Sequence, residues 1–533
     1  MRKQYGVVIF LNGLLMMSHM AVAGSRAELG NPEELALMLN QSEPCEERLT
    51  TMCRANQLSF ARDFLKYDAN DIKTGLVNAL ISYFPRSEVL FTEAPLPHDK
   101  TNKNSISYRL RRQGYREADR TLTSIILLQK ILLGDDPSEF ATPIKPLNPD
   151  HAEIQKIRQM VFDFLTEQPG VALDETVFAK VKIEKLHAMI VRLIFHDLGK
   201  IPGFIQEYKA RLQDDGIDTS TLSADHNLAL CDIQDRYLLE MMPPVACVLP
   251  GPRSYMKQSD IGAFNPGRVF QFEAPARHIL ALAGLPEQSF KFSIIKEIFD
   301  VGGARGSEHP NGSFWIKPVI STYFKLYEDY EAGKIGANPV KVASYYGELL
   351  QVAGEELGLP TATADDLAIV KLARLFRLNQ FPKESRSRRI TALLDAVNKL
   401  DSKMKQSILE ELKKNGINDG WALTLGYIPQ ISENIQTSLG TWVKDQAGEE
   451  KITDASVDRA MKVSLEVLFK AVQLARNSLA ILEPKLIGEN GEYTLELPGV
   501  ADFVKKNGVD ALEESELVFK PAGRNSAEIR AKQ

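Results

Sequence analysis

The feature that most constrains this chain is an apolar helix that runs directly into a histidine and an aspartate. Mostly hydrophobic residues fill positions 186–195, and His196 and Asp197 follow at once. Gly199 is expected to end the helix, with Lys200 just beyond it. An imidazole and a carboxylate side by side can both bind one divalent cation, and a nearby ammonium can neutralise a phosphoryl oxygen. The alternative is a helix end that simply carries polar caps.

Helical periodicity dominates the rest of the chain and predicts an all-α, mostly helical fold. The clearest example begins near Asp454, where apolar residues recur at spacings of three and four from Val457 to Val472. Only Tyr493 to Leu497 alternates as a strand does, and the polar tail after Lys520 is expected to fray. With 533 residues, the chain is long enough for several domains.

The N-terminus has the three parts of an export signal. Arg2 and Lys3 give a positive start, residues 7–17 are mostly apolar, and Ala21 and Ala23 supply the small residues of a cleavage site. Removal of residues 1–23 would place the protein in the periplasm or outside the cell. The apolar run is too short for a comfortable transmembrane helix, so we expect no membrane span in the mature chain. A buried N-terminal helix is the alternative.

Charge and cysteine content limit the possible partners and compartments. The net charge of −6 gives no sign of a nucleic-acid-binding surface. The four cysteines fit an exported protein, because disulfides persist in oxidising compartments. Two local bonds, Cys45–Cys53 and Cys231–Cys247, are the simplest pairing, and four buried thiols are the alternative. No CxxC pair occurs, so a thiolate zinc site is not expected.

The string His-Asp-Leu-Gly-Lys at 196–200 resembles the H-D-x-G-K signature of the HD-domain superfamily, whose members are largely helical, metal-dependent phosphohydrolases. The resemblance implies an HD-like metal-binding domain at 149–335. It would lie between an N-terminal helical region at 24–148 and a C-terminal helical region at 336–533. A Pro- and Gly-rich stretch, residues 243–275, is interpreted as a long loop or lid inserted in the HD-like domain.

In HD proteins separate helices each deliver one ligand to a common centre, so the resemblance implies metal ligands along this chain. His196 and Asp197 correspond to the central pair. Asp300, in an apolar helix with the pattern D-x-x-x-A, resembles the late aspartate. His226 resembles the third ligand of HD proteins that hold two metals, although Asp225 before it could simply cap a helix start.

The first ligand of the family has two candidates in this sequence. His187 lies nine residues before His196, about 900° around a helix, and therefore points away from it. His151 begins a separate amphipathic segment and is preferred for that reason. His278 could be a fourth ligand on its own helix, or equally a histidine that faces the core or the solvent.

A glycine-rich turn follows Asp300 and is a second candidate for phosphate binding. Small residues at 302–307 would let backbone N–H groups approach an anion, and Arg305 could bind phosphate through two hydrogen bonds. The turn is not a P-loop, because no Gly-Lys-Ser/Thr ends it. Together with Lys200, Arg305 is therefore a candidate to neutralise charge on a phosphate. A turn of no special purpose is the alternative.

The resemblance implies a definite chemistry, with Asp197, Lys200 and Arg305 as the catalytic candidates. The His and Asp ligands would hold one or two divalent cations (Mn²⁺, Fe²⁺, Mg²⁺ or Zn²⁺), which activate a bound water and polarise the phosphoryl group. We expect a phosphohydrolase that acts on a nucleotide or another phosphorylated small molecule. Two alternatives stay open: an HD-fold binding or signalling protein that has lost turnover, and an exported helical interaction protein in which the motif is accidental.

Overall fold

The computed structural model divides into two compact units, residues 1–55 and residues 56–533. The predicted signal at 1–23 lies outside the described residues. The structure describes residues 45–71, 75–98, 101–135, 148–219, 226–261, 272, 276–304, 306–308, 315, 317–381, 383–417, 419, 422–440, 443–444, 450–451, 454–481, 492–522 and 524–531.

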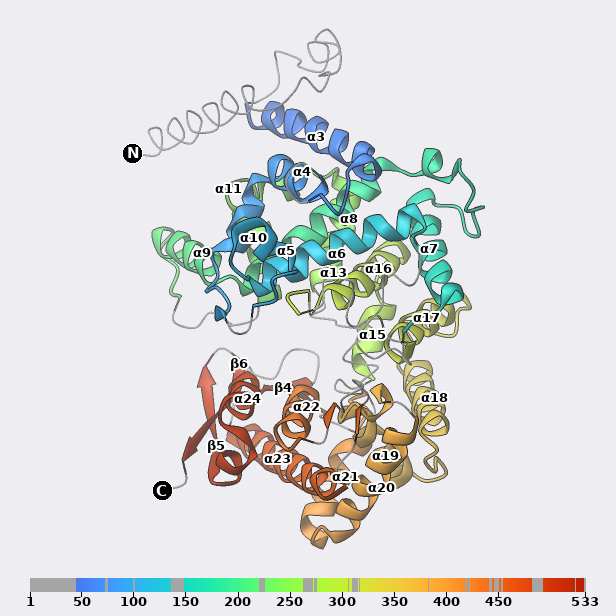
Figure 1. The fold of residues 1–533 in the computed structure, drawn as a ribbon, viewed down its shortest axis with the longest axis vertical. Coiled ribbons are helices and arrows are strands. Elements are labelled where there is room, and N and C mark those ends of the chain that lie inside the picture. Colours follow the sequence, from blue (N-terminus) through green and yellow to red (C-terminus); the bar gives the residue numbers. More distant parts are fainter. Residues whose placement is uncertain are drawn as a thin grey trace. The chain divides into compact units, whose positions relative to one another are not determined.

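The prediction of a mostly helical fold is confirmed (Figure 1). Up to residue 331 the helices are α3 (Cys45–Asp63), η1 (Phe64–Lys66), α4 (Leu76–Tyr83), η2 (Pro85–Thr92), α5 (Ile106–Arg111), α6 (Arg116–Leu133), α7 (His151–Thr166), η6 (Val177–Lys180), α8 (Ile183–Phe195), η7 (Leu198–Lys200), α9 (Pro202–Asp214), α10 (His226–Arg236), α11 (Leu238–Met241), α12 (Pro243–Ala246), α13 (Pro250–Ile261), α15 (Arg277–Ala283), α16 (Glu287–Gly303) and α17 (Lys317–Glu331). Beyond it they are α18 (Pro339–Leu357), α19 (Ala364–Leu375), η8 (Leu378–Gln380), α20 (Lys383–Lys399), α21 (Ser402–Lys413), α22 (Ile428–Ser438), α23 (Asp454–Ile481) and α24 (Pro498–Glu513).

Three helices, α6, α8 and α16, form the core of the region that contains the His-Asp pair. They pack against one another pairwise, side by side in the upper half of Figure 1. Helix α8 buries every residue from Lys185 to Phe195, and α16 buries every residue from Ser289 to Asp300. A helix that is apolar on all sides must be surrounded by other elements. The polar residues at the ends of these two helices are therefore carried into the interior with them.

Local sequence signals explain where several helices begin. Helix α7 starts at a capping box in which the Asp150 side chain accepts from the Glu153 backbone N–H and Glu153 accepts from Asp150 in return. Pro243 and Pro250 are the first residues of α12 and α13, where a proline is well tolerated. The prediction of a long loop or lid at 243–275 is therefore wrong for residues 243–261, which are largely helical. The rest of that stretch, except Phe272, is outside the described residues.

The C-terminal region adds a four-stranded sheet to the helices. Strands β1 (Ala422–Gly426), β4 (Glu492–Glu496), β5 (Ser515–Ala522) and β6 (Arg524–Ala531) pair in the order β1-β4-β6-β5, and β2 (Val443–Lys444) pairs separately with β3 (Glu450–Lys451). Strand β4 confirms the predicted strand at 493–497, and α23 confirms the helix predicted from Asp454. The tail after Lys520 does not fray as predicted, because β5 and β6 form an antiparallel ladder there.

The cysteines correct both predicted pairings. Cys53 and Cys247 are both disulfide-bonded, whereas Cys231 is not. The predicted local bond Cys231–Cys247 is therefore wrong, and so is Cys45–Cys53, since Cys247 must take its partner from that pair.

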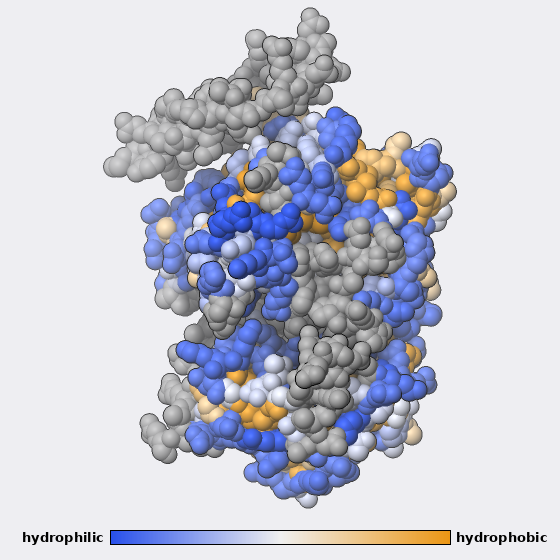
Figure 2. Space-filling view, in the orientation of Figure 1, coloured by the Kyte–Doolittle hydropathy of each residue, from blue (hydrophilic) through white to orange (hydrophobic). Residues whose placement is uncertain are grey.

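The described helices do not include one with the length and hydrophobicity that a bilayer span requires. Figure 2 shows a mostly hydrophilic face interrupted by a few hydrophobic areas. Among the described residues of 56–533, the large exposed hydrophobic side chains are Leu133, Leu239, Val340 and Val352, which come from three different helices.

Candidate metal centre

Helix α8 ends immediately before the His-Asp pair, earlier than the sequence predicted. The helix ends at Phe195, and the His196 N–H donates to the Arg192 carbonyl as its C-cap. The chain then forms the single 3₁₀ turn η7, so Gly199 lies inside this turn and does not end the helix. This tight turn holds His196 and Asp197 at the buried end of α8, with 3% and 2% of their surfaces exposed.

The structure brings His196, Asp197 and Asp300 together. Asp300 comes from the last turns of α16, and ligand atoms of the three residues all lie within 4.8 Å of one another. The His196 Nε2 is 2.8 Å from the Asp300 Oδ1 and 3.2 Å from the Asp197 Oδ2. Two ligands at 90° on an octahedral ion with bonds of about 2.1 Å are about 3 Å apart. These separations therefore suit one face of a divalent metal site.

A hydrogen bond from the second ring nitrogen fixes the orientation of the His196 imidazole. The His196 Nδ1 is 2.8 Å from the Leu193 carbonyl oxygen, which can only accept, so Nδ1 carries a proton. Nε2 is thereby directed at the two carboxylates. Metal-binding histidines are commonly fixed in this way, by a hydrogen bond from the second ring nitrogen to a carbonyl or carboxylate.

An arginine that the sequence analysis did not single out completes the cluster. Arg120, on α6, places its Nε 2.7 Å from the Asp300 Oδ1 and 3.0 Å from the Asp197 Oδ2, and its Nη2 2.6 Å from the Asp300 Oδ1. The guanidinium therefore hydrogen-bonds the Asp300 Oδ1 and forms an ion pair with the Asp197 Oδ2, the two oxygens that face His196. Its side chain is 21% exposed, against 2% and 7% for those of Asp197 and Asp300.

Electrostatics keep both aspartates ionised. Burial alone would raise the pKa of Asp197, but Arg120, His196 and Lys200 outweigh it and hold that pKa well below its usual range. Burial likewise opposes the ionisation of Asp300, and Arg120 and His196 lower its pKa well below normal. For His196, burial lowers the pKa while the two carboxylates raise it more, so the net shift is upward. Ionised carboxylates are what a metal ligand requires.

Lys200 lies beside the cluster, as the sequence predicted for its position. Its Nζ forms an ion pair with the Asp197 Oδ1 and lies 3.8 Å from the Glu117 Oε2. Burial and the nearby Asp197 raise the pKa of Glu117, against the opposing effect of Lys200. Lys200 therefore pairs with the outer carboxylate oxygen of Asp197, Oδ1, whereas the inner one, Oδ2, faces His196 and Arg120.

Other predicted ligands lie elsewhere. His151 is exposed at the start of α7, and His187 is buried on α8, where its Nε2 is 2.8 Å from the Gln57 Oε1. His278 is buried on α15 and does not join the group of described residues that could hold an ion. These predictions assumed that further helices would each supply one histidine to the centre. The structure instead brings Arg120 there, from α6.

Two predicted residues cannot be placed. His226 begins α10, but its side chain is outside the described part of the structure. Arg305 is also outside it.

The glycine-rich turn after Asp300 allows close helix packing. A Cβ at Gly303 would overlap the Ser124 hydroxyl and the Arg120 carbonyl oxygen, and one at Gly306 would overlap the Asp119 carbonyl oxygen. Only a residue without a side chain lets the end of α16 approach α6 this closely. The turn thus has a structural role, because it sets the distance between Arg120 and Asp300.

Sequence reasoning missed Arg120 and Glu117 for a physical reason. Both lie in the segment Arg-Glu-Ala-Asp-Arg at 116–120, which has the appearance of an ordinary charged helix start. The available signal was an arginine shortly before a mostly apolar stretch, residues 125–133, which indicates a helix packed deeply in the protein.

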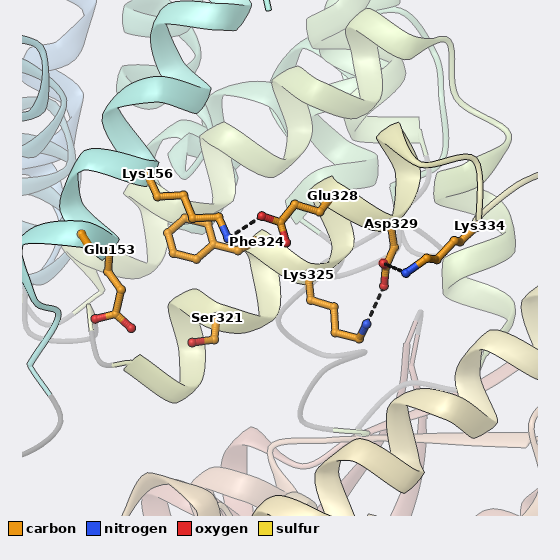
Figure 3. A pocket seen from close by; sticks show the side chains of 9 residues that line it. Glu153, Lys156, Ser321, Phe324, Lys325, Glu328, Asp329 and Lys334 are labelled. Carbon is orange, nitrogen blue, oxygen red and sulfur yellow. Dashed lines mark hydrogen bonds and ion pairs between the residues drawn. The ribbon is translucent and has the colours of Figure 1, made fainter. Parts of the chain in front are cut away.

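A separate pocket of about 510 Å³ lies between α7 and α17 (Figure 3). Its three lysines lie among three carboxylates: Lys156 pairs with Glu328, Lys325 and Lys334 both pair with Asp329, at 2.7 and 2.9 Å, and Glu153 is the third acid of the lining. Lys156 also lies 4.6 Å from the centre of the Phe324 ring. Since these charges cancel locally, the cluster at the end of α8 is the better candidate for chemistry.

Comparison with known proteins adds one match. Residues 88–486 match the profile of a family described as a family of unknown function (DUF6829). The matched range includes α6, α8 and α16, and with them every residue of the cluster. No curated protein and no solved structure matches the chain.

Proposed function

Because the chain belongs to this family of unknown function, we propose its activity from the cluster itself: an HD-type, metal-dependent phosphohydrolase that acts on a nucleotide or another phosphoester. The observation that supports the proposal most is the convergence of His196, Asp197 and Asp300 at separations that suit one divalent ion. The resemblance of residues 196–200 to the HD signature supports it independently.

The donor atoms of these three residues fit a divalent metal ion. One imidazole nitrogen and two carboxylate oxygens suit Mn²⁺, Fe²⁺, Mg²⁺ or Zn²⁺. His196, Asp197 and Asp300 would hold such an ion, which supplies an activated water and polarises a phosphoryl oxygen. A second ion would need further ligands, and His226 is the proposed source.

The chain's own cations would act on the substrate. Lys200 and Arg120 lie at the rim of the cluster, with 26% and 21% of their side chains exposed, so both can reach an anion from the solvent side. A preorganised cation beside a phosphoryl group stabilises the charge that develops there. Glu117 holds Lys200 from the other side at 3.8 Å and acts as a positioning residue.

The test is hydrolysis of a phosphoester panel after the protein is stripped of metal and reloaded with each ion in turn. The panel contains p-nitrophenyl phosphate, bis-p-nitrophenyl phosphate, and nucleoside mono- and triphosphates. Asp197→Asn keeps the shape of the side chain but removes its charge, and turnover should fall at least about 100-fold, since outer-shell changes alone cost 10- to 100-fold. Asp214→Asn, an exposed aspartate at the end of α9, is the matched control and should retain full activity. Full activity in Asp197→Asn would refute the proposal.

One observation favours a second candidate, a binding or signalling protein of HD type without turnover. Arg120 already pairs with the two carboxylates that a metal would need. If wild-type protein binds Mn²⁺ but hydrolyses no member of the panel, this second function replaces the first.

A further inference from the structure

The position of Arg120 carries an inference about how the metal centre is loaded. We propose that Arg120 is a built-in substitute for the cation, which holds the two aspartates together in the metal-free protein and must leave them when a divalent ion binds. The inference rests on the proposed metal centre, and it adds a residue that opposes metal binding instead of supporting it.

The first argument is that both cations need the same atoms. The Asp300 Oδ1 is 2.8 Å from the His196 Nε2 and 2.7 Å from the Arg120 Nε. The Asp197 Oδ2 is 3.2 Å from that Nε2 and 3.0 Å from that Nε. An ion coordinated by the three ligands would have to bind both of the oxygens that the guanidinium now shares.

The second argument is charge. Two carboxylates face Arg120 on one side, and Lys200 already holds the outer oxygen of Asp197. A dication added to this group would lie within about 4 Å of the guanidinium, and like charges at that distance repel strongly where water is scarce. Arg120 therefore has to move before the ion can bind tightly.

The third argument is that the Arg120 side chain is partly exposed to solvent, whereas the aspartates are not. The aspartates are fixed in the core by α8 and α16, whereas the Arg120 side chain is 21% exposed, so its movement away from them would lead toward solvent. An arginine released beside a bound metal would be placed to bind an anionic oxygen through its planar fork. The same side chain can thus close the metal-free site and serve the loaded one.

The experiment compares Mn²⁺ binding by isothermal titration in wild type, Arg120→Ala and Arg116→Ala. Arg116 is an exposed arginine on the first turn of the same helix, so Arg116→Ala is the matched control. We expect Arg120→Ala to bind Mn²⁺ at least about tenfold more tightly than wild type, with the control unchanged. Equal or weaker binding by Arg120→Ala would overturn the inference.

Thermal unfolding gives a second readout, in which the same variant should lose stability without metal although it binds metal more tightly. Metal-free Arg120→Ala should have a lower Tm than wild type, because two buried carboxylates lose their main cation. Mn²⁺ should raise its Tm by more than it raises that of wild type, since tighter binding to the native state stabilises more. If Arg120→Ala does not fold, Arg120→Lys tests the inference: lysine lacks the bridging fork, so Mn²⁺ should still bind more tightly than to wild type.

These outcomes separate the inference from the proposed activity. Tighter Mn²⁺ binding in Arg120→Ala without turnover in any variant would support the inference and refute the hydrolase. Metal-dependent turnover with equal Mn²⁺ affinity in all variants would refute the inference and leave the hydrolase standing. Absence of Mn²⁺ binding in every variant would overturn both.

Discussion

Two segments of this protein, residues 183–214 and residues 364–399, fold through the same order of elements but differ in what they carry. The first is α8, η7 and α9, and the second is α19, η8 and α20. In both, a mostly buried helix ends, one 3₁₀ turn follows, and another helix begins within a few residues. Only the first contains a His-Asp pair, His196 and Asp197.

Two backbone hydrogen bonds of the two turns correspond. The His196 N–H donates to the Arg192 carbonyl at 2.9 Å, and the Phe376 N–H donates to the Leu372 carbonyl at 3.0 Å. The Lys200 N–H donates to the Asp197 carbonyl at 2.9 Å, and the Gln380 N–H donates to the Arg377 carbonyl at 3.0 Å. The two turns still differ in backbone conformation, because Arg377 has a φ of 57° and Asp197 a φ of −101°.

The difference lies in what faces each turn. In the first segment, Asp197 pairs with Arg120 and His196 lies beside Asp300. Both of these partners come from helices distant in sequence, α6 and α16. In the second, Phe376 and Arg377 occupy the corresponding places, and Arg377 forms an ion pair with Glu433 of α22 at 2.7 Å. The side chains of that pair are 20% and 28% exposed, so water shares in solvating both charges. A binding centre therefore requires both the turn and a second helix that brings the facing acid.

The largest expected effect tests whether the two ion pairs differ as their burial suggests. Asp300→Ala removes one of the two buried carboxylates that Arg120 and His196 share, and should lower the free energy of unfolding by about 3–5 kcal/mol. Glu433→Ala should cost less than about 1 kcal/mol, because its pair is partly solvated. Urea unfolding of both variants measures the difference. Equal losses would show that the cluster is no more tightly coupled to the fold than the second pair.

A smaller effect contrasts the lysines of the two segments. Lys200 is paired with Asp197, whereas Lys371 of α19 is 4% exposed and donates to the Lys414 carbonyl oxygen at 3.3 Å. Burial lowers the pKa of Lys371 to about 8, against the opposing charges of Glu411 and Asp419. The unfolded chain therefore binds more protons between about pH 8 and pH 10.5, and stability should rise with pH across that window.

Lys371→Met should accordingly stabilise the protein by about 1–3 kcal/mol at pH 7 and remove this rise. Chemical unfolding at pH 7 and pH 10 measures both quantities. Lys341→Met, an exposed lysine on α18, is the control and should change stability by no more than about 0.5 kcal/mol. Destabilisation by Lys371→Met at pH 7 would mean that the buried ammonium has a favourable partner.

The smallest effect concerns a carboxyl group next to the first segment. Glu93 accepts from the Glu117 backbone N–H at 2.7 Å, and burial, helped by the nearby Glu117 charge, raises its pKa to about 7. The folded state therefore binds more protons between about pH 4.5 and pH 7, so this group lowers stability as pH rises through that window.

Glu93→Gln should be more stable than wild type by about 1 kcal/mol at pH 8 and equal to it at pH 5. A series of Tm measurements over this range tests the sign. The exposed Glu175→Gln serves as the control and should follow wild type at every pH. A Glu93→Gln variant that loses stability at pH 8 would show that the carboxylate is ionised and favourable.

The sequence alone determined the helical class, the α8 helix and the His-Asp pair at its end. These depend on periodicity and on a contiguous string, which are local properties of the chain. The Asp300 prediction relied on an apolar helix of the right pattern, and burial carried that side chain into the cluster. Strand β4 was predicted from its alternation, but the β5–β6 ladder was not, because its polar residues resemble a frayed tail.

Only the tertiary structure decided which cation faces the two aspartates. His151 and His187 are chemically suitable ligands, but α7 and α8 direct them away from the centre. Arg120 reaches it because Gly303 and Gly306 let α16 pack closely against α6. The distance between two helices depends on the residues that separate them, which lie far apart in the chain. The local pattern around residue 120 indicates burial, but it could not reveal that a guanidinium faces these two aspartates.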